Sequence, residues 1–187
     1  MLGSATALGV KDAYFTSQDT VTWCFKTLSG LYDLSGKTAL EPSCGSGAFV
    51  RLDLGLKWTT NELYPEYAKG YEPTYNIDFA KGDLTPLGKF DFIIGNPPFG
   101  KSTMAARKFV LRSLEIADVV AMVLPFGCRR ITFLDKLPTD VRVVHDELIP
   151  NLSFELPDGS VKEVKCSFMV FAHEKGYERP VELDLDD

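Results

Sequence analysis

The sequence predicts an α/β domain with a mostly parallel seven-stranded sheet, an antiparallel C-terminal strand and helices on both faces. Short apolar segments alternate along the chain with amphipathic ones, which is the rhythm of strand–helix–strand units. The chain has 187 residues, 45% of them hydrophobic, which suits one core of ordinary domain size. No repeat or low-complexity linker divides it, so a single domain is expected.

Seven segments have the length and composition of strands. They are residues 38–41, 58–62, 75–79, 90–95, 119–124, 141–148 and 164–172. Stretches of helical character separate the first five, which favours a parallel sheet covered on both faces. Pro157-Asp158-Gly159 marks a turn before the last segment, so the last two strands are expected to form a hairpin-like antiparallel pair.

Four segments can form helices, namely residues 17–31, 64–70, 102–116 and 129–136. Ser102 is the expected N-cap of the third helix. An inward-facing stripe on that helix would consist of Ala105, Phe109, Leu111 and Leu114. The expected division of the chain is an N-terminal arm (1–13), one folded domain (14–175) and an acidic tail (176–187).

Composition excludes some classes of function. The formal charge of −6 argues against a protein that coats nucleic acid by charge alone, so any such contact must be local. No apolar stretch reaches the length of a membrane span and no signal peptide is evident, so we expect a soluble, cytoplasmic protein with no membrane partner. The four cysteines lack metal-binding spacing, and no metal is expected.

The strand at 90–95 ends abruptly in Asn96-Pro97-Pro98-Phe99. Neither proline can donate a backbone hydrogen bond, so the strand cannot continue past Asn96. Pro98 also holds Pro97 extended, which leaves the carbonyls of Asn96 and Pro97 with few local donors. A ligand amino group could satisfy them, and this loop is the first candidate for an active site.

A glycine-rich turn follows the strand at 38–41. Gly45 and Gly47 would let the backbone approach a ligand closely, and Glu41 would suit a cationic group. The turn lacks the third glycine of the dinucleotide fingerprint and the lysine of a P-loop. An ordinary tight turn is the alternative interpretation.

Two further carboxylates close predicted strands on the same edge of the sheet. Glu62 comes about twenty residues after the first strand end, where it could accept both ribose hydroxyls, and Asp83 could accept from an adenine amino group. Each alone could equally be a helix cap or a surface charge. Together with Glu41, Gly45 and Gly47 they outline an adenosine-shaped site.

These motifs resemble those of class I S-adenosylmethionine-dependent methyltransferases, and most closely adenine-N6 DNA methyltransferases with the gamma motif order. The matching elements are Tyr14-Phe15-Thr16, residues 41–49, Glu62, Gly82-Asp83 and Asn96-Pro97-Pro98-Phe99. The resemblance spans residues 14–172 and implies a Rossmann-like domain that uses S-adenosylmethionine and releases S-adenosylhomocysteine.

The resemblance also implies roles for individual residues. Cofactor-binding residues would be Phe15, Thr16, Glu41, Ser43, Gly45, Gly47, Glu62, Leu63, Asp83 and Asn96. Catalytic residues, which hold the acceptor base, would be Asn96, Pro97, Pro98 and Phe99. Lys101, Arg129 and Arg130 near the mouth could contact phosphates of a substrate, and the alternative for them is a solvated surface.

The expected function is transfer of a methyl group to adenine N6 in DNA. Alternatives are an RNA adenine-N6 or guanine-N2 methyltransferase, a protein glutamine methyltransferase and a non-catalytic scaffold subunit. Only fifteen residues follow Ala172, too few for the target-recognition domain that DNA methyltransferases of this type usually carry. A specificity subunit, a homodimer or the shape of the substrate is expected to supply recognition instead.

Overall fold

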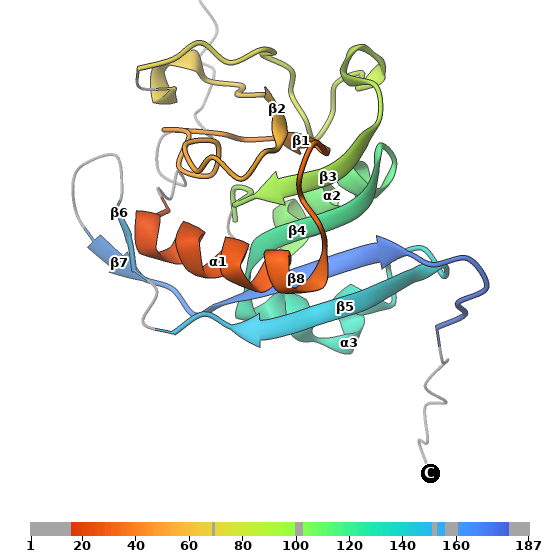
Figure 1. Cartoon of the computed structure of the whole chain (residues 1–187). Coiled ribbons are helices and arrows are strands. Elements are labelled where there is room, and N and C mark those ends of the chain that lie inside the picture. Colours follow the sequence, from red (N-terminus) through yellow and green to blue (C-terminus); the bar gives the residue numbers. More distant parts are fainter. Residues whose placement is uncertain (1–15, 69, 100–102, 151–152, 156–160, 180–187) are drawn as a thin grey trace, which may run out of the picture.

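The structure is a computed structural model that describes residues 16–68, 70–99, 103–150, 153–155 and 161–179 (Figure 1). Its centre is a six-stranded sheet in the order β2-β1-β3-β4-β8-β5. The strands are β1 (Thr38–Glu41), β2 (Lys57–Thr60), β3 (Phe90–Gly95), β4 (Ala117–Pro125), β5 (Val141–Leu148) and β8 (Cys166–His173). The first four are parallel, and β8 pairs antiparallel with both β4 and β5. The predicted fold class is therefore confirmed.

The sheet has one strand fewer than predicted, because residues 75–79 form no strand. Only an isolated parallel bridge joins Tyr75 to Asn61, just beyond the end of β2. The Asn61 side chain forms the two hydrogen bonds that a neighbouring strand would otherwise make with Ile77. Its Oδ1 accepts from the Ile77 N–H at 2.8 Å and its Nδ2 donates to the Ile77 carbonyl at 2.9 Å. Asp78 next turns the chain by accepting from two backbone N–H groups.

Three α-helices are present among the described residues: α1 (Gln18–Leu31), α2 (Thr103–Leu114) and α3 (Ile131–Leu134). Ser17 caps α1 by accepting from the Thr20 N–H. The helix expected at 64–70 is only a 3₁₀ turn, η1 (Pro65–Tyr67), and two more such turns are η2 (Thr85–Leu87) and η3 (Phe126–Arg129). The expected N-cap Ser102 lies outside the described residues.

Helices cover the two faces of the sheet separately, with α1 on one side and α2 and α3 on the other (Figure 1). Side chains of α1 share a core with alternate residues of β3, β4 and β8. The opposite core includes Phe109 and Leu114 of α2, as predicted, and also Ala106 and Val110, whereas Ala105 and Leu111 are only half-buried. No helix in the described ranges is long and apolar enough to cross a membrane.

A small antiparallel hairpin stands apart from the main sheet. It pairs β6 (Ser153–Glu155) with β7 (Val161–Glu163). The predicted turn at 157–159 falls between these short strands, outside the described residues. The two long strands that were expected to pair, β5 and β8, do so antiparallel through seven residue pairs, with an irregularity between Val143 and His145.

Candidate functional site

The ends of the parallel strands bring the predicted acidic and amide residues to one edge of the sheet. β1 ends at Glu41 and pairs with both β2 and β3, which lead into Glu62 and Asn96. The start of α1 lies at the same edge, because the Asn96 Nδ2 donates to the Thr16 Oγ1 at 3.1 Å. Residues 16, 41, 62 and 96 therefore meet here although they are far apart in sequence.

Glu41 is an acid buried without a compensating charge from the described part of the chain. Its side chain is 3% exposed, and its Oε2 has no hydrogen-bond partner among the described residues. A β-carbon added to Gly95 on the next strand would lie 3.4 Å from the Glu41 Cγ, so the glycine makes room for this side chain. Burial raises the pKa of Glu41 well above its usual range, and the nearby Glu62 raises it further.

Glu62 is also buried, but its carboxylate is bonded to the backbone. Its Oε2 accepts from the Gly45 N–H at 2.8 Å and its Oε1 from the Tyr64 N–H at 3.0 Å. Burial raises the pKa of Glu62, and bonds from backbone N–H groups, including that of Leu63, oppose the shift. Glu62 thus fastens the glycine turn to the end of β2.

The glycine turn needs its two glycines for conformation and for space. Gly45 and Gly47 have φ values of 48° and 75°, in the left-handed region. A β-carbon on Gly47 would lie 2.7 Å from the ring of Tyr71, whose hydroxyl donates to the Gly45 carbonyl at 3.1 Å. Tyr71 is a site residue that sequence reasoning missed, because a lone aromatic between predicted strands carries no motif.

Cys44 lies in the same turn and is not a reactive thiol. It is buried, and burial raises its pKa to about 12. Its backbone N–H donates to the Asn61 carbonyl at 3.0 Å, which ties the turn to the end of β2.

The Asn96 side chain is oriented by its neighbours. Its amide nitrogen donates to the Thr16 hydroxyl. The Ser43 hydroxyl donates to the backbone carbonyl of Asn96 at 3.4 Å. Pro97 is buried and Pro98 is exposed. The predicted residues Thr16, Ser43 and Asn96 are therefore joined in one small network, whereas Phe15 and Lys101 lie outside the described residues.

Phe99 is packed into the core in this structure. It is 5% exposed and meets Phe154 of β6 edge to face, with ring centroids 5.6 Å apart. The β6–β7 hairpin thus covers the loop that follows Asn96. A base could stack on Phe99 only after this contact opens.

The described contacts do not join Asp83 to the acidic pair. Asp83 is fully exposed, and its Oδ1 accepts from the backbone N–H and hydroxyl of Thr85 at 2.9 and 2.6 Å. These bonds lower its pKa and commit this oxygen to a local turn before η2. Asp78, which sequence reasoning missed, lies nearer the site edge, because it directly follows the Ile77 backbone held by Asn61.

The two predicted phosphate-contacting arginines differ in their surroundings. The Arg129 Nε bonds to the Asp146 Oδ2 at 2.7 Å, and its guanidinium carbon lies 5.6 Å from the centroid of the Phe126 ring. Arg130 is exposed and stands between η3 and α3. The Arg129 side chain is therefore fixed by Asp146 and Phe126, whereas the Arg130 side chain is exposed to solvent.

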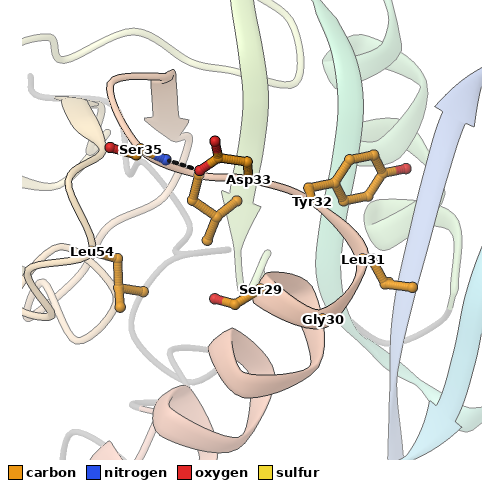
Figure 2. A pocket seen from close by; sticks show the side chains of 8 residues that line it. Ser29, Gly30, Leu31, Tyr32, Asp33, Ser35 and Leu54 are labelled. Carbon is orange, nitrogen blue, oxygen red and sulfur yellow. Dashed lines mark hydrogen bonds between the residues drawn. The ribbon is translucent and has the colours of Figure 1, made fainter.

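Two surface hollows lie away from this edge. One is lined by residues 29–35 and Leu54, where the Ser35 N–H donates to Asp33 (Figure 2). The other includes Phe90, Ala117 and His173, at the start of β3 and β4. Neither contains a predicted site residue. No group of three metal-binding side chains occurs among the described residues.

Comparison with known proteins gives one sequence relative. No family model matches the chain. It is 30% identical, over 103 residues, to the modification methylase CviBIII of Paramecium bursaria Chlorella virus NC1A. That similarity covers 46% of this chain and 25% of the viral protein, so the match spans about a quarter of the relative.

Solved structures match over most of the chain. A protein from Pyrococcus horikoshii proposed to be an RNA methyltransferase aligns with a TM-score of 0.71 and 22% identity, covering 88% of this chain and 87% of that one. The M protein of the type I restriction enzyme EcoKI gives 0.64 and 14% identity, covering 86% and 44%. Magnesium protoporphyrin IX methyltransferase from Synechocystis PCC 6803, solved with S-adenosylmethionine bound, gives 0.59 and 15% identity, covering 83% and 79%.

Proposed function

We propose that this chain, which has the fold of the class I S-adenosylmethionine-dependent methyltransferases, transfers a methyl group to the exocyclic N6 amine of adenine in DNA. The observation that carries the proposal is the junction of Asn96 with Thr16 and Ser43 at the same sheet edge as the Glu41–Glu62 pair. The similarity to a DNA modification methylase supports the choice of acceptor.

The residues at this edge fit S-adenosylmethionine. The buried Glu41 has no cation paired with it among the residues that the structure describes, and the amino group of the cofactor would supply one. Gly45 and Gly47 give the turn the left-handed backbone that it needs, and Tyr71 fills the space beside Gly47. Glu62 keeps acceptor capacity, because a carboxylate has about four lone-pair sites and the described backbone bonds use only some of them. When bound, the cofactor supplies an electrophilic methyl group on its sulfonium.

Asn96 and Pro97 would activate the acceptor. An adenine amino nitrogen is a weak nucleophile because its lone pair is delocalised into the ring. The Asn96 Oδ1 and the Pro97 carbonyl would accept the two N–H bonds, which would hold the nitrogen toward tetrahedral geometry and free its lone pair for attack. The Thr16 contact fixes the Asn96 amide so that its oxygen can serve this role. In duplex DNA the base must first flip out of the stack.

RNA is a second candidate acceptor. The structural match to the Pyrococcus protein covers nearly all of both chains, whereas the match to the EcoKI M protein covers less than half of the latter. This chain therefore aligns almost end to end with a protein proposed to act on RNA. An adenine or guanine in a single strand would need no flipping from a duplex.

The test is to incubate the protein with labelled S-adenosylmethionine and, separately, duplex DNA, single-stranded DNA and total RNA. The modified nucleoside is then identified by mass. We expect N6-methyladenine from DNA, and label only in RNA would move the second candidate to first place. Asn96→Ala should lower turnover by about 10²–10³-fold while cofactor binding, measured by calorimetry, is retained. Unchanged turnover in Asn96→Ala would refute the mechanism.

A further inference from the structure

An exposed aromatic ring follows β4, the strand next to the one that leads into the proposed acceptor loop, and two cations lie close to this ring. Phe126 directly follows β4 and is 39% exposed. The Lys165 Nζ lies 4.7 Å from the centroid of this ring, and the Arg129 guanidinium carbon lies 5.6 Å from it. A backbone hydrogen bond also joins Phe126 to Lys165, because the Phe126 N–H donates to the Lys165 carbonyl at 2.9 Å.

This ring belongs to the same sheet edge as Asn96. Gly95, the last residue of β3, pairs with Met122 in the neighbouring parallel strand β4. Asn96 follows Gly95 by one residue and Phe126 follows Met122 by four, so Phe126 lies roughly 10 Å further along the strand direction than Asn96. That distance corresponds to about three stacked base steps. A strand whose target base sits at Asn96 would bring a nucleotide about three positions from the target to Phe126.

The charges around the ring favour a phosphate-bearing partner. Arg129 is held against the ring by Asp146, and Lys165 is exposed and forms no ion pair with any acid of the described residues. Arg130 adds a further exposed cation next to Arg129. This local basic surface occurs on a chain whose formal charge is −6. An apolar protein surface would leave these cations without partners.

We propose that Phe126, Lys165 and Arg129 form a platform for the nucleic-acid strand next to the acceptor base. A base about three positions from the acceptor stacks on Phe126, Lys165 contacts a backbone phosphate, and Arg129 keeps the ring in place. The proposal rests on the proposed function, because it assigns the platform to the substrate of that site. It gives Lys165, which the sequence analysis did not single out, a part in substrate binding.

Binding of a fluorescent adenine-containing single-stranded oligonucleotide, as DNA and as RNA, tests the platform by anisotropy. Phe126→Leu keeps an apolar side chain but removes the ring, and should weaken binding about tenfold, whereas Phe126→Trp should retain it. Lys165→Gln should weaken binding a few-fold and reduce the slope of affinity against salt by about one. The matched control Lys175→Gln removes an exposed charge at the opposite edge and should have no effect.

Cofactor affinity is measured for every variant, and it should remain that of the natural chain if only the platform is altered. If Phe126→Leu and Lys165→Gln bind the oligonucleotide as well as the natural chain does, the platform is refuted even when methyl transfer occurs. If the natural chain binds neither oligonucleotide, the platform is likewise refuted. If binding depends on both residues but no nucleic acid is methylated, the platform stands and the proposed function fails.

Discussion

At the scale of single residues, the buried carboxyl of Glu41 would favour binding of a cationic ligand and lower the stability of the unliganded protein. Its carboxyl is buried beside another acid, and one oxygen has no partner among the described residues. A carboxyl with a raised pKa holds its proton in the folded state at pH values where the unfolded chain has lost it. The free energy of unfolding therefore falls as pH rises from the unfolded pKa of Glu41 to its raised folded pKa.

We predict opposite effects of Glu41→Gln on folding and on binding. Without cofactor, the variant should be more stable than the natural chain at about pH 8, by about 1 kcal/mol, because no buried charge has to form. Its affinity for S-adenosylmethionine should fall about ten- to a hundredfold and lose its rise with pH, because a cationic ligand prefers the ionised carboxyl. Urea unfolding and calorimetry measure the two effects.

Glu62→Gln is the matched control for this prediction. The substitution removes an equal charge from the same edge, but the Glu62 carboxylate that it replaces accepts hydrogen bonds from the N–H groups of Gly45 and Tyr64. We expect it to destabilise the protein rather than stabilise it, because an amide has only one oxygen for these donors. Equal stabilisation by both variants would show that simple charge repulsion, and not the unpartnered position of Glu41, is responsible.

At the scale of elements, Asn61 joins three segments that the sheet ladder alone would not hold. It is 1% exposed, and its side chain bonds to the Pro42 carbonyl and to both backbone groups of Ile77. We predict that Asn61→Ala lowers the free energy of unfolding by about 2–4 kcal/mol, because buried backbone groups lose their partners. Urea unfolding measures the change.

Asn76→Ala is the comparison at the same edge. Asn76 is exposed and donates once, to the Glu62 carbonyl at 2.9 Å, so its loss should cost less than about 1 kcal/mol. If the two variants were equally stable, the Asn61 bonds would not be what holds residues 75–79 against β2.

At the scale of the whole molecule, His173 joins three elements at the amino edge of the sheet, opposite the proposed site. We call the contacts of this side chain the histidine clasp. The His173 Nδ1 lies 2.7 Å from the Asp140 Oδ2, and its Nε2 lies 3.0 Å from the Leu114 carbonyl. Both ring nitrogens therefore face acceptors that link β8, the start of β5 and the end of α2. Burial lowers the pKa of His173, but these acceptors outweigh it and the net shift is upward; the same contact lowers the pKa of Asp140.

The signs of these shifts predict a maximum of stability in weakly acidic solution. The raised pKa of His173 gives a stabilisation that is lost as pH rises through its folded pKa, and the lowered pKa of Asp140 gives one that is lost as pH falls through its own. His173→Asn should therefore flatten the decline in unfolding free energy between about pH 6 and 8. Denaturant unfolding across this range measures it, and an unchanged slope would contradict the role of the clasp.

Much of the fold followed from local pattern. The bounds of β1, β3 and β5 agree with the apolar runs that predicted them, because proline, glycine and charged residues end those runs sharply. Residues 75–79 were predicted as a strand on the same grounds, and that was wrong. Both backbone groups of Ile77 bond to the side chain of Asn61 instead of to a neighbouring strand, a tertiary contact that no periodicity reveals.

The sequence by itself determined the fold class and the motifs Glu41, Gly45, Gly47, Glu62 and Asn96, because parallel strands bring their carboxyl ends to one edge whatever the details of packing. Only the tertiary structure decided the surroundings of these residues. It placed Tyr71 against the glycine turn, buried Phe99 under Phe154, bonded Asp83 to Thr85, and set Lys165 beside Phe126. Such contacts join residues distant in the chain, so they depend on how loops and edges pack and not on local spacing.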